Sequence, residues 1–201
     1  MPRRYDLERD DFLELWQEKM FLGQEFLTWL WLASEADNNF VLKDGAELTV
    51  FFDGSLKLER GLGDFKQSLT SQPPRRPDSQ AWTEAFIGAA RNKQVASAKL
   101  RVACREREWS LSLPADTLCP RGVRIMAAGD ADKEAEEDGA LARIGALLDR
   151  ASLLSELNDH LEGLLTSFLE LRLSQKWEGE ELPRLRQWVR RWVKEGSKAA
   201  S

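Results

Sequence analysis

Few folds can accommodate residues 26–32 of this chain, which are apolar except for one threonine and lie in a segment of helical periodicity. Apolar residues recur at helical spacing over residues 7–36, which predicts one or two helices, with Gly23 as a candidate break. A helix that is apolar all round must be buried on every side. We therefore expect Trp29 and Trp31 to lie in the middle of the core.

Short β-strand runs further along the chain could cover this helix. Between residues 39 and 70 such runs are separated by turn signals, among them residues 44–45 and 53–54, both Asp-Gly. This pattern is typical of an antiparallel meander. A three-residue loop at the second signal would pair Phe52 with Leu56 and keep both on the apolar face, so we prefer it to a two-residue turn.

A second hairpin is predicted around residues 99–113. A turn at residues 106–107 would pair Cys104 with Trp109 and Val102 with Leu111, which leaves the other face of the hairpin polar.

Three further elements complete the first two-thirds of the chain. The prolines of residues 73–77 predict a stiff exposed connector, because proline fits neither a helix interior nor a central strand. A helix is expected after it, over residues 78–92, and a strand over residues 123–126.

The last third reads as helical. Residues 141–173 carry leucines at steps of three and four, and one continuous helix of that length would be about 50 Å long. Such a helix either breaks near Gly163 or projects to meet a partner. Pro183 suits the first turn of a final amphipathic helix.

Together these elements predict an α+β fold of antiparallel hairpins packed on helices, with a long C-terminal helical segment. We expect an N-terminal helical extension over residues 1–20 and an α+β core over 21–126. An acidic linker or helix start should occupy 127–140, and C-terminal helices packing on the core should occupy 141–201.

Composition narrows the class of protein. The chain has 201 residues and only two cysteines, Cys104 and Cys119, which fits a reducing cytoplasm better than a secreted disulfide scaffold. No apolar run approaches the roughly 20 residues that span a bilayer, so no membrane partner is expected. With 29 basic and 34 acidic residues, the net charge is −5, which argues against a compact dedicated DNA-binding module.

Locally basic segments nevertheless remain candidates for phosphate contact. Each has a second interpretation: the hairpin cations could form a solvated sheet face, and the arginines of the last helix could face water while its tryptophans face the core. The candidate nucleic-acid-binding residues are Lys99, Arg101 and Arg105 of the second hairpin, and Arg184, Arg186, Arg190, Arg191 and Lys194 of the last helix.

Catalytic machinery is not apparent. The one histidine, His160, has no nucleophile motif near it in sequence, and the two cysteines do not form zinc-binding pairs. Phosphate-cradling glycine loops are also absent. We expect a protein that is not an enzyme and that has no catalytic residues, no metal site and no cofactor.

Four segments stand out together: FLGQEFLTWLWLASE at residues 21–35, REWSL at 107–111, FLELRL at 168–173 and ELPRL at 181–185. In this order they resemble segments of the bacterial recombination-associated protein RdgC family. The first segment is the most specific of the four.

The resemblance implies a nucleoid-associated, non-catalytic protein that binds duplex DNA without sequence preference and assembles as a ring-like dimer. Longer family members place a further N-terminal half before the matching run, whereas this chain has about twenty residues there. We therefore expect either a homodimer or a partner chain that supplies the missing half. The alternative is a scaffold protein that assembles through its long C-terminal helix without binding DNA.

Overall fold

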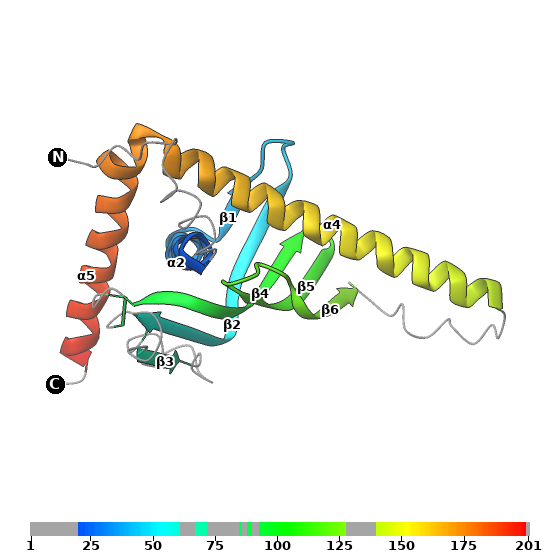
Figure 1. The fold of residues 1–201 in the computed structure, drawn as a ribbon, viewed down its shortest axis with the longest axis horizontal. Helices are drawn as coiled ribbons and strands as arrows, with labels where there is room; N and C mark the ends of the chain where they lie inside the picture. Colours follow the sequence, from blue (N-terminus) through cyan, green and yellow to red (C-terminus); the bar gives the residue numbers. More distant parts are fainter. Residues whose placement is uncertain are drawn as a thin grey trace, which may run out of the picture.

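The computed structural model describes residues 20–60, 67–71, 85, 88–89, 93–127 and 140–199 (Figure 1). In this part of the chain, one antiparallel sheet carries helices on its apolar face. The fold class is therefore α+β, as predicted. The helix expected over residues 78–92 falls mostly outside the described residues, as does the connector before it.

The sheet has six strands within these ranges, all paired antiparallel. They are β1 (Asn39–Val41), β2 (Glu47–Arg60), β3 (Gln67–Ser71), β4 (Gln94–Cys104), β5 (Arg107–Pro114) and β6 (Arg121–Ala127). Five of them follow the order β1-β2-β4-β5-β6, and β3 pairs with β2 outside this order. The long strand β2 pairs along one edge with β4, and along its other edge with β1 near its start and β3 near its end.

The two Asp-Gly signals have different outcomes. The first forms the predicted turn between β1 and β2, where Gly45 has φ +82° and the backbone N–H of Ala46 donates to Asp44 Oδ1 at 3.0 Å. The prediction of a loop at residues 53–55 is wrong, because β2 continues through it.

Continuous pairing with β4 explains that difference. Phe52 lies opposite Leu100 and Leu56 opposite Ala98, so β2 has two more residues than β4 between these pairs. The second Asp-Gly signal is absorbed as a bulge rather than a turn, since breaking β2 there would leave the start of β4, before Ser97, without a ladder partner.

The β4–β5 hairpin has the predicted faces but a different register. Its turn is Arg105-Glu106, with Arg105 at φ 55°, so Cys104 lies opposite Arg107 and Val102 opposite Trp109. The predicted pairing was wrong by two residues on β5. Because side chains alternate with a period of two, the shift leaves every side chain on its expected face.

Helix α2 (Met20–Ala36) lies at the centre of the core, as predicted. Leu27, Leu30 and Trp31 have no exposed surface. The ring of Phe168 packs against Phe26 and Trp29, with centroids 5.6 Å and 5.4 Å away.

Helix α4 (Ala140–Leu173) is one continuous helix without a break at Gly163, and it projects past the sheet at its N-terminal end (Figure 1). Its C-terminal half packs on the core through Leu157, Leu161, Leu164 and Phe168, all buried. The projecting half instead exposes apolar side chains, with Ile144, Leu147 and Leu148 at 52%, 67% and 65% exposure.

A short π-helical segment, η3 (Trp177–Glu181), leads into the last helix, α5 (Leu182–Ala199). Pro183 lies in the first turn of α5, as predicted. Leu185 and Val189 of α5 are buried and belong to the core cluster. The side chains of residues 192–199 lie outside the described part.

Gly23 marks a close contact and not a helix break. A Cβ added to Gly23 would lie 1.9 Å from the backbone oxygen of Ala115, whereas one added to Gly145 on the projecting half of α4 would meet nothing within 4 Å. Gly23→Ala should therefore lower the free energy of unfolding by about 1–3 kcal/mol despite its gain in helix propensity. Gly145→Ala is the matched control and should be neutral or stabilising. Urea denaturation that shows equal stability for the two variants would contradict this packing.

The two cysteines should differ in reactivity. Cys104 is buried, and burial raises the pKa of its thiol, whereas Cys119 is exposed. Because the thiolate is the reactive form, a disulfide reagent should label Cys119 quickly and Cys104 slowly. Cys119→Ser should remove the fast phase, and equal rates for both thiols should appear only in denaturant. A fast phase that survives in Cys119→Ser would contradict the burial of Cys104.

Candidate nucleic-acid interface

The structure separates the predicted basic residues into two groups. Lys99 and Arg101 alternate with the buried Leu100 and Val102, so they lie on the polar face of the sheet. The α5 arginines instead belong to the helical layer on the apolar face. Arg105 lies apart from both groups, exposed in the β4–β5 turn.

On the polar face, pairing across β4, β5 and β6 aligns cations with serines. Lys99 lies opposite Ser112, which lies opposite Arg121. In the next row Arg101 lies opposite Ser110, which lies opposite Arg124. Strand geometry places the two rows about 7 Å apart and the two cations of a row about 10 Å apart. We call this set of four cations and two serines the sheet-face cluster.

A β-bulge brings both β6 arginines to the same face. Regular alternation would place Arg121 and Arg124, three residues apart, on opposite faces. The register shifts between Ser110 and Ser112, and Gly122 adopts φ +60° at this point. The inserted residue lets both arginines line the same hollow as Lys99, with a volume of about 520 Å³. Sequence reasoning missed both arginines, and a glycine between two arginines was the only signal.

One member of the sheet-face cluster is held by neighbours. Arg101 Nη1 lies 3.2 Å from Glu108 Oε1, and its guanidinium lies over the Phe51 ring, 5.3 Å from the centroid. Lys99, Arg121 and Arg124 have no carboxylate within ion-pair distance among the described residues. Across β4, β5 and β6, this face therefore presents four cations against one carboxylate.

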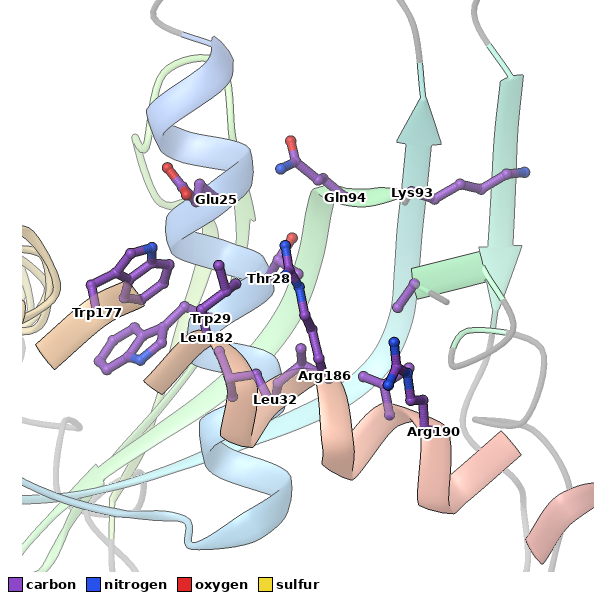
Figure 2. Close-up of a pocket in the computed structure, with 13 residues that line it drawn as sticks. Glu25, Thr28, Trp29, Leu32, Lys93, Gln94, Trp177, Leu182, Arg186 and Arg190 are labelled. Carbon is purple, nitrogen blue, oxygen red and sulfur yellow. The ribbon is translucent and has the colours of Figure 1, made fainter. Parts of the chain in front are cut away.

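The predicted α5 residues do not form one surface. Arg184 is paired with Glu181, with 2.7 Å between Nη2 and Oε1, and Arg191 is exposed. The side chain of Lys194 lies outside the described residues. Arg186 and Arg190 line a cavity between α2 and α5 (Figure 2).

This cavity, which we call the α2–α5 cavity, has a volume of about 410 Å³ and an apolar wall. Figure 2 shows Trp29 and Trp177 close together at one end, with Arg186 and Arg190 rising from α5 toward the other. Its apolar wall includes Leu32, Leu182, Leu185 and Val189.

His160 lies in the core interface between α4 and the sheet. It is buried, and its ring meets Trp109 edge-on with centroids 5.7 Å apart. Its Nε2 atom lies 3.8 Å from Glu156 Oε1, and Glu156 also pairs with Arg107 of the β4–β5 hairpin. Within the described ranges, no group of three or more histidine, cysteine or acidic side chains could hold a metal ion.

Comparison with protein-family models, with curated proteins and with solved structures finds no match for this chain. The resemblance to the RdgC family therefore stays a prediction. In the part of the chain that the structure covers, no helix combines the length and apolar character needed to cross a bilayer.

Proposed function

We propose that this chain is a non-catalytic DNA-binding accessory protein that holds the phosphate backbone on the sheet-face cluster without reading sequence. The observation that carries the proposal is the pair of cation–serine–cation rows across β4, β5 and β6. The resemblance to the RdgC family, which implies a nucleoid or recombination accessory role, points in the same direction.

The chemistry of the cluster suits phosphate and not base edges. Lysine and arginine supply charge to phosphate oxygens, and the serine hydroxyls between them can donate hydrogen bonds to the same oxygens. The cations lie on β4 and β6, on either side of β5, and the sheet fixes their spacing. Such contacts give position and affinity but carry no sequence information.

The net charge of −5 does not prevent this binding, because attraction to a polyanion depends on local charge. Exposed charges more than about 8–10 Å away are largely screened at physiological salt. The acidic residues elsewhere should therefore weaken the interaction at low salt more than at physiological salt. Binding should still fall steeply as salt displaces the condensed counterions.

The direct test is fluorescence anisotropy with a labelled duplex oligonucleotide across a salt series. Lys99→Gln combined with Arg124→Gln should reduce affinity about tenfold or more at low salt and lower the magnitude of the log–log salt slope by about 2. Neither residue is buried, so the fold should be retained, and a thermal melt checks this.

The matched control is Arg150→Gln combined with Lys176→Gln, which removes the same charge from exposed positions on α4 and just before η3. It should leave affinity and slope nearly unchanged. Equal loss in both double variants would show a general charge effect and contradict the assignment to the sheet face. Absence of binding at micromolar protein and low salt would exclude the function itself.

A second candidate function, self-assembly through α4, is favoured by one observation. The projecting half of α4 exposes Ile144, Leu147 and Leu148, whereas later apolar positions of the same helix are buried. Two copies packed antiparallel along these segments would cover each other's apolar stripe, as in other paired helices. This assembly would account for a helix that extends beyond the sheet it covers.

Leu147→Lys combined with Leu148→Lys tests this second function. Light scattering after size exclusion should show that the unaltered chain is a dimer and that the variant is a monomer. Circular dichroism should show that the variant is still folded, because these side chains bury little area inside one copy. Only the melting temperature of the unaltered chain should rise with protein concentration. Ala146→Lys, at an exposed neighbouring position, controls for added charge. A monomeric unaltered chain would contradict self-assembly.

A further inference from the structure

The α2–α5 cavity is separate from the sheet-face cluster, because it lies in the helical layer on the other side of the sheet. Its volume of about 410 Å³ falls within the roughly 300–1,000 Å³ typical of small-molecule sites. Its walls come from α2, η3, α5 and the start of β4, where Lys93 and Gln94 lie (Figure 2).

The two ends of this cavity differ in chemistry. At one end the rings of Trp29 and Trp177 provide an apolar surface, and Trp29 Nε1 already donates to Glu181 Oε1 at 3.2 Å. The carboxylate of Glu25, on the same side, is paired with Arg172 at 3.0 Å. These contacts engage the Trp29 N–H and one oxygen of Glu25, whereas the buried Oε2 atom of Glu25 has no hydrogen-bond partner.

The other end carries uncompensated positive charge. Arg186 and Arg190 are one helical turn apart on α5, and neither has a carboxylate within ion-pair distance in the described part of the chain. Like charges at this spacing destabilise a helix. In Figure 2 both side chains rise from α5 toward the cavity, whereas Lys93 extends away from it. A bound anion would relieve this repulsion.

We propose that the α2–α5 cavity binds a small carboxylate with an apolar body. The apolar body would pack against Trp29 and Trp177, and the carboxylate would accept hydrogen bonds from Arg186 and Arg190. Guanidinium groups bind carboxylates through two parallel N–H donors, which makes such pairs both strong and directional. The apolar end of the cavity would therefore contact the apolar body of the ligand, and the cationic end would contact its carboxylate.

The experiment compares octanoate with octan-1-ol, which shares its apolar chain but lacks the charge. Isothermal titration calorimetry at low salt should show octanoate binding about tenfold or more tightly than the alcohol, as charge-assisted hydrogen bonds require. Arg186→Gln combined with Arg190→Gln should weaken octanoate to the level of the alcohol and leave the alcohol unchanged. Both positions are exposed, so the variant should fold.

Two further variants separate the cavity from the rest of the surface. Ala89→Leu adds volume to the cavity wall and should weaken octanoate and octan-1-ol alike. Lys99→Gln combined with Arg124→Gln alters only the sheet-face cluster and should leave octanoate binding intact. Failure of the carboxylate site and failure of the proposed DNA binding would therefore affect different variants.

Three outcomes would overturn the proposal. Equal affinity for octanoate and octan-1-ol would show that charge plays no part. Octanoate binding that survives in the Arg186/Arg190 variant would place the site elsewhere. Displacement of octanoate by duplex DNA, with weaker DNA binding in that same variant, would assign the two arginines to phosphate contact instead.

Discussion

The fold depends on burying residues 26–33 of helix α2, where every side chain except Thr28 is buried. A helical segment without a polar face cannot lie on a surface, so the sheet, α4 and the α5 region each cover part of it. Helix α4 covers α2 through Phe168, whose ring packs against the rings of Phe26 and Trp29. It fixes where α4 crosses the sheet, and Arg172 of α4 reinforces the position by pairing with Glu25 of α2 at 3.0 Å. The close approach of Gly23 to Ala115 shows how little space separates α2 from the loop after β5.

Sequence periodicity predicted which side chains face the core, but neither the pairing register of the β4–β5 hairpin nor the continuity of β2. Alternation placed Val102 and Trp109 on the buried face and Lys99 and Arg101 on the polar face, and each lies there. The predicted pairing register was wrong, because a shift of two residues leaves the same side chains on the buried face. The hydrophobic pattern therefore fits both registers equally well. The Asp-Gly signal at residues 53–54 failed for a related reason. Long-range pairing with β4 outweighs a local turn preference, and no local pattern contains that information.

The candidate site shows the same limit more sharply. Lys99 and Arg101 could be placed on one face from β4 alone, whereas Arg121 and Arg124 reach that face only because Gly122 forms a bulge. The sequence predicted a strand at residues 123–126, and regular alternation in that strand separates the two arginines. The α5 arginines were grouped by sequence proximity, but α5 turns them in different directions, toward Glu181, into a cavity or to solvent. Proximity in sequence did not predict which α5 arginines lie together. Alternation predicted the face of the β4 cations correctly, but it could not place the β6 arginines, because a bulge separates them.

These placements give the two faces of the sheet different physical roles. The apolar face carries the α2–α5 cavity beside the helices, where an apolar wall lies next to the two arginines. The polar face carries its cations on a rigid sheet in contact with water, where individual contacts are weak and several must act together. A polyanion suits the second setting because it supplies many charges at once, and a small anion suits the first because one well-placed pair of arginines is enough. The separation of the two arginine groups by the sheet therefore favours two different ligands over one continuous binding surface.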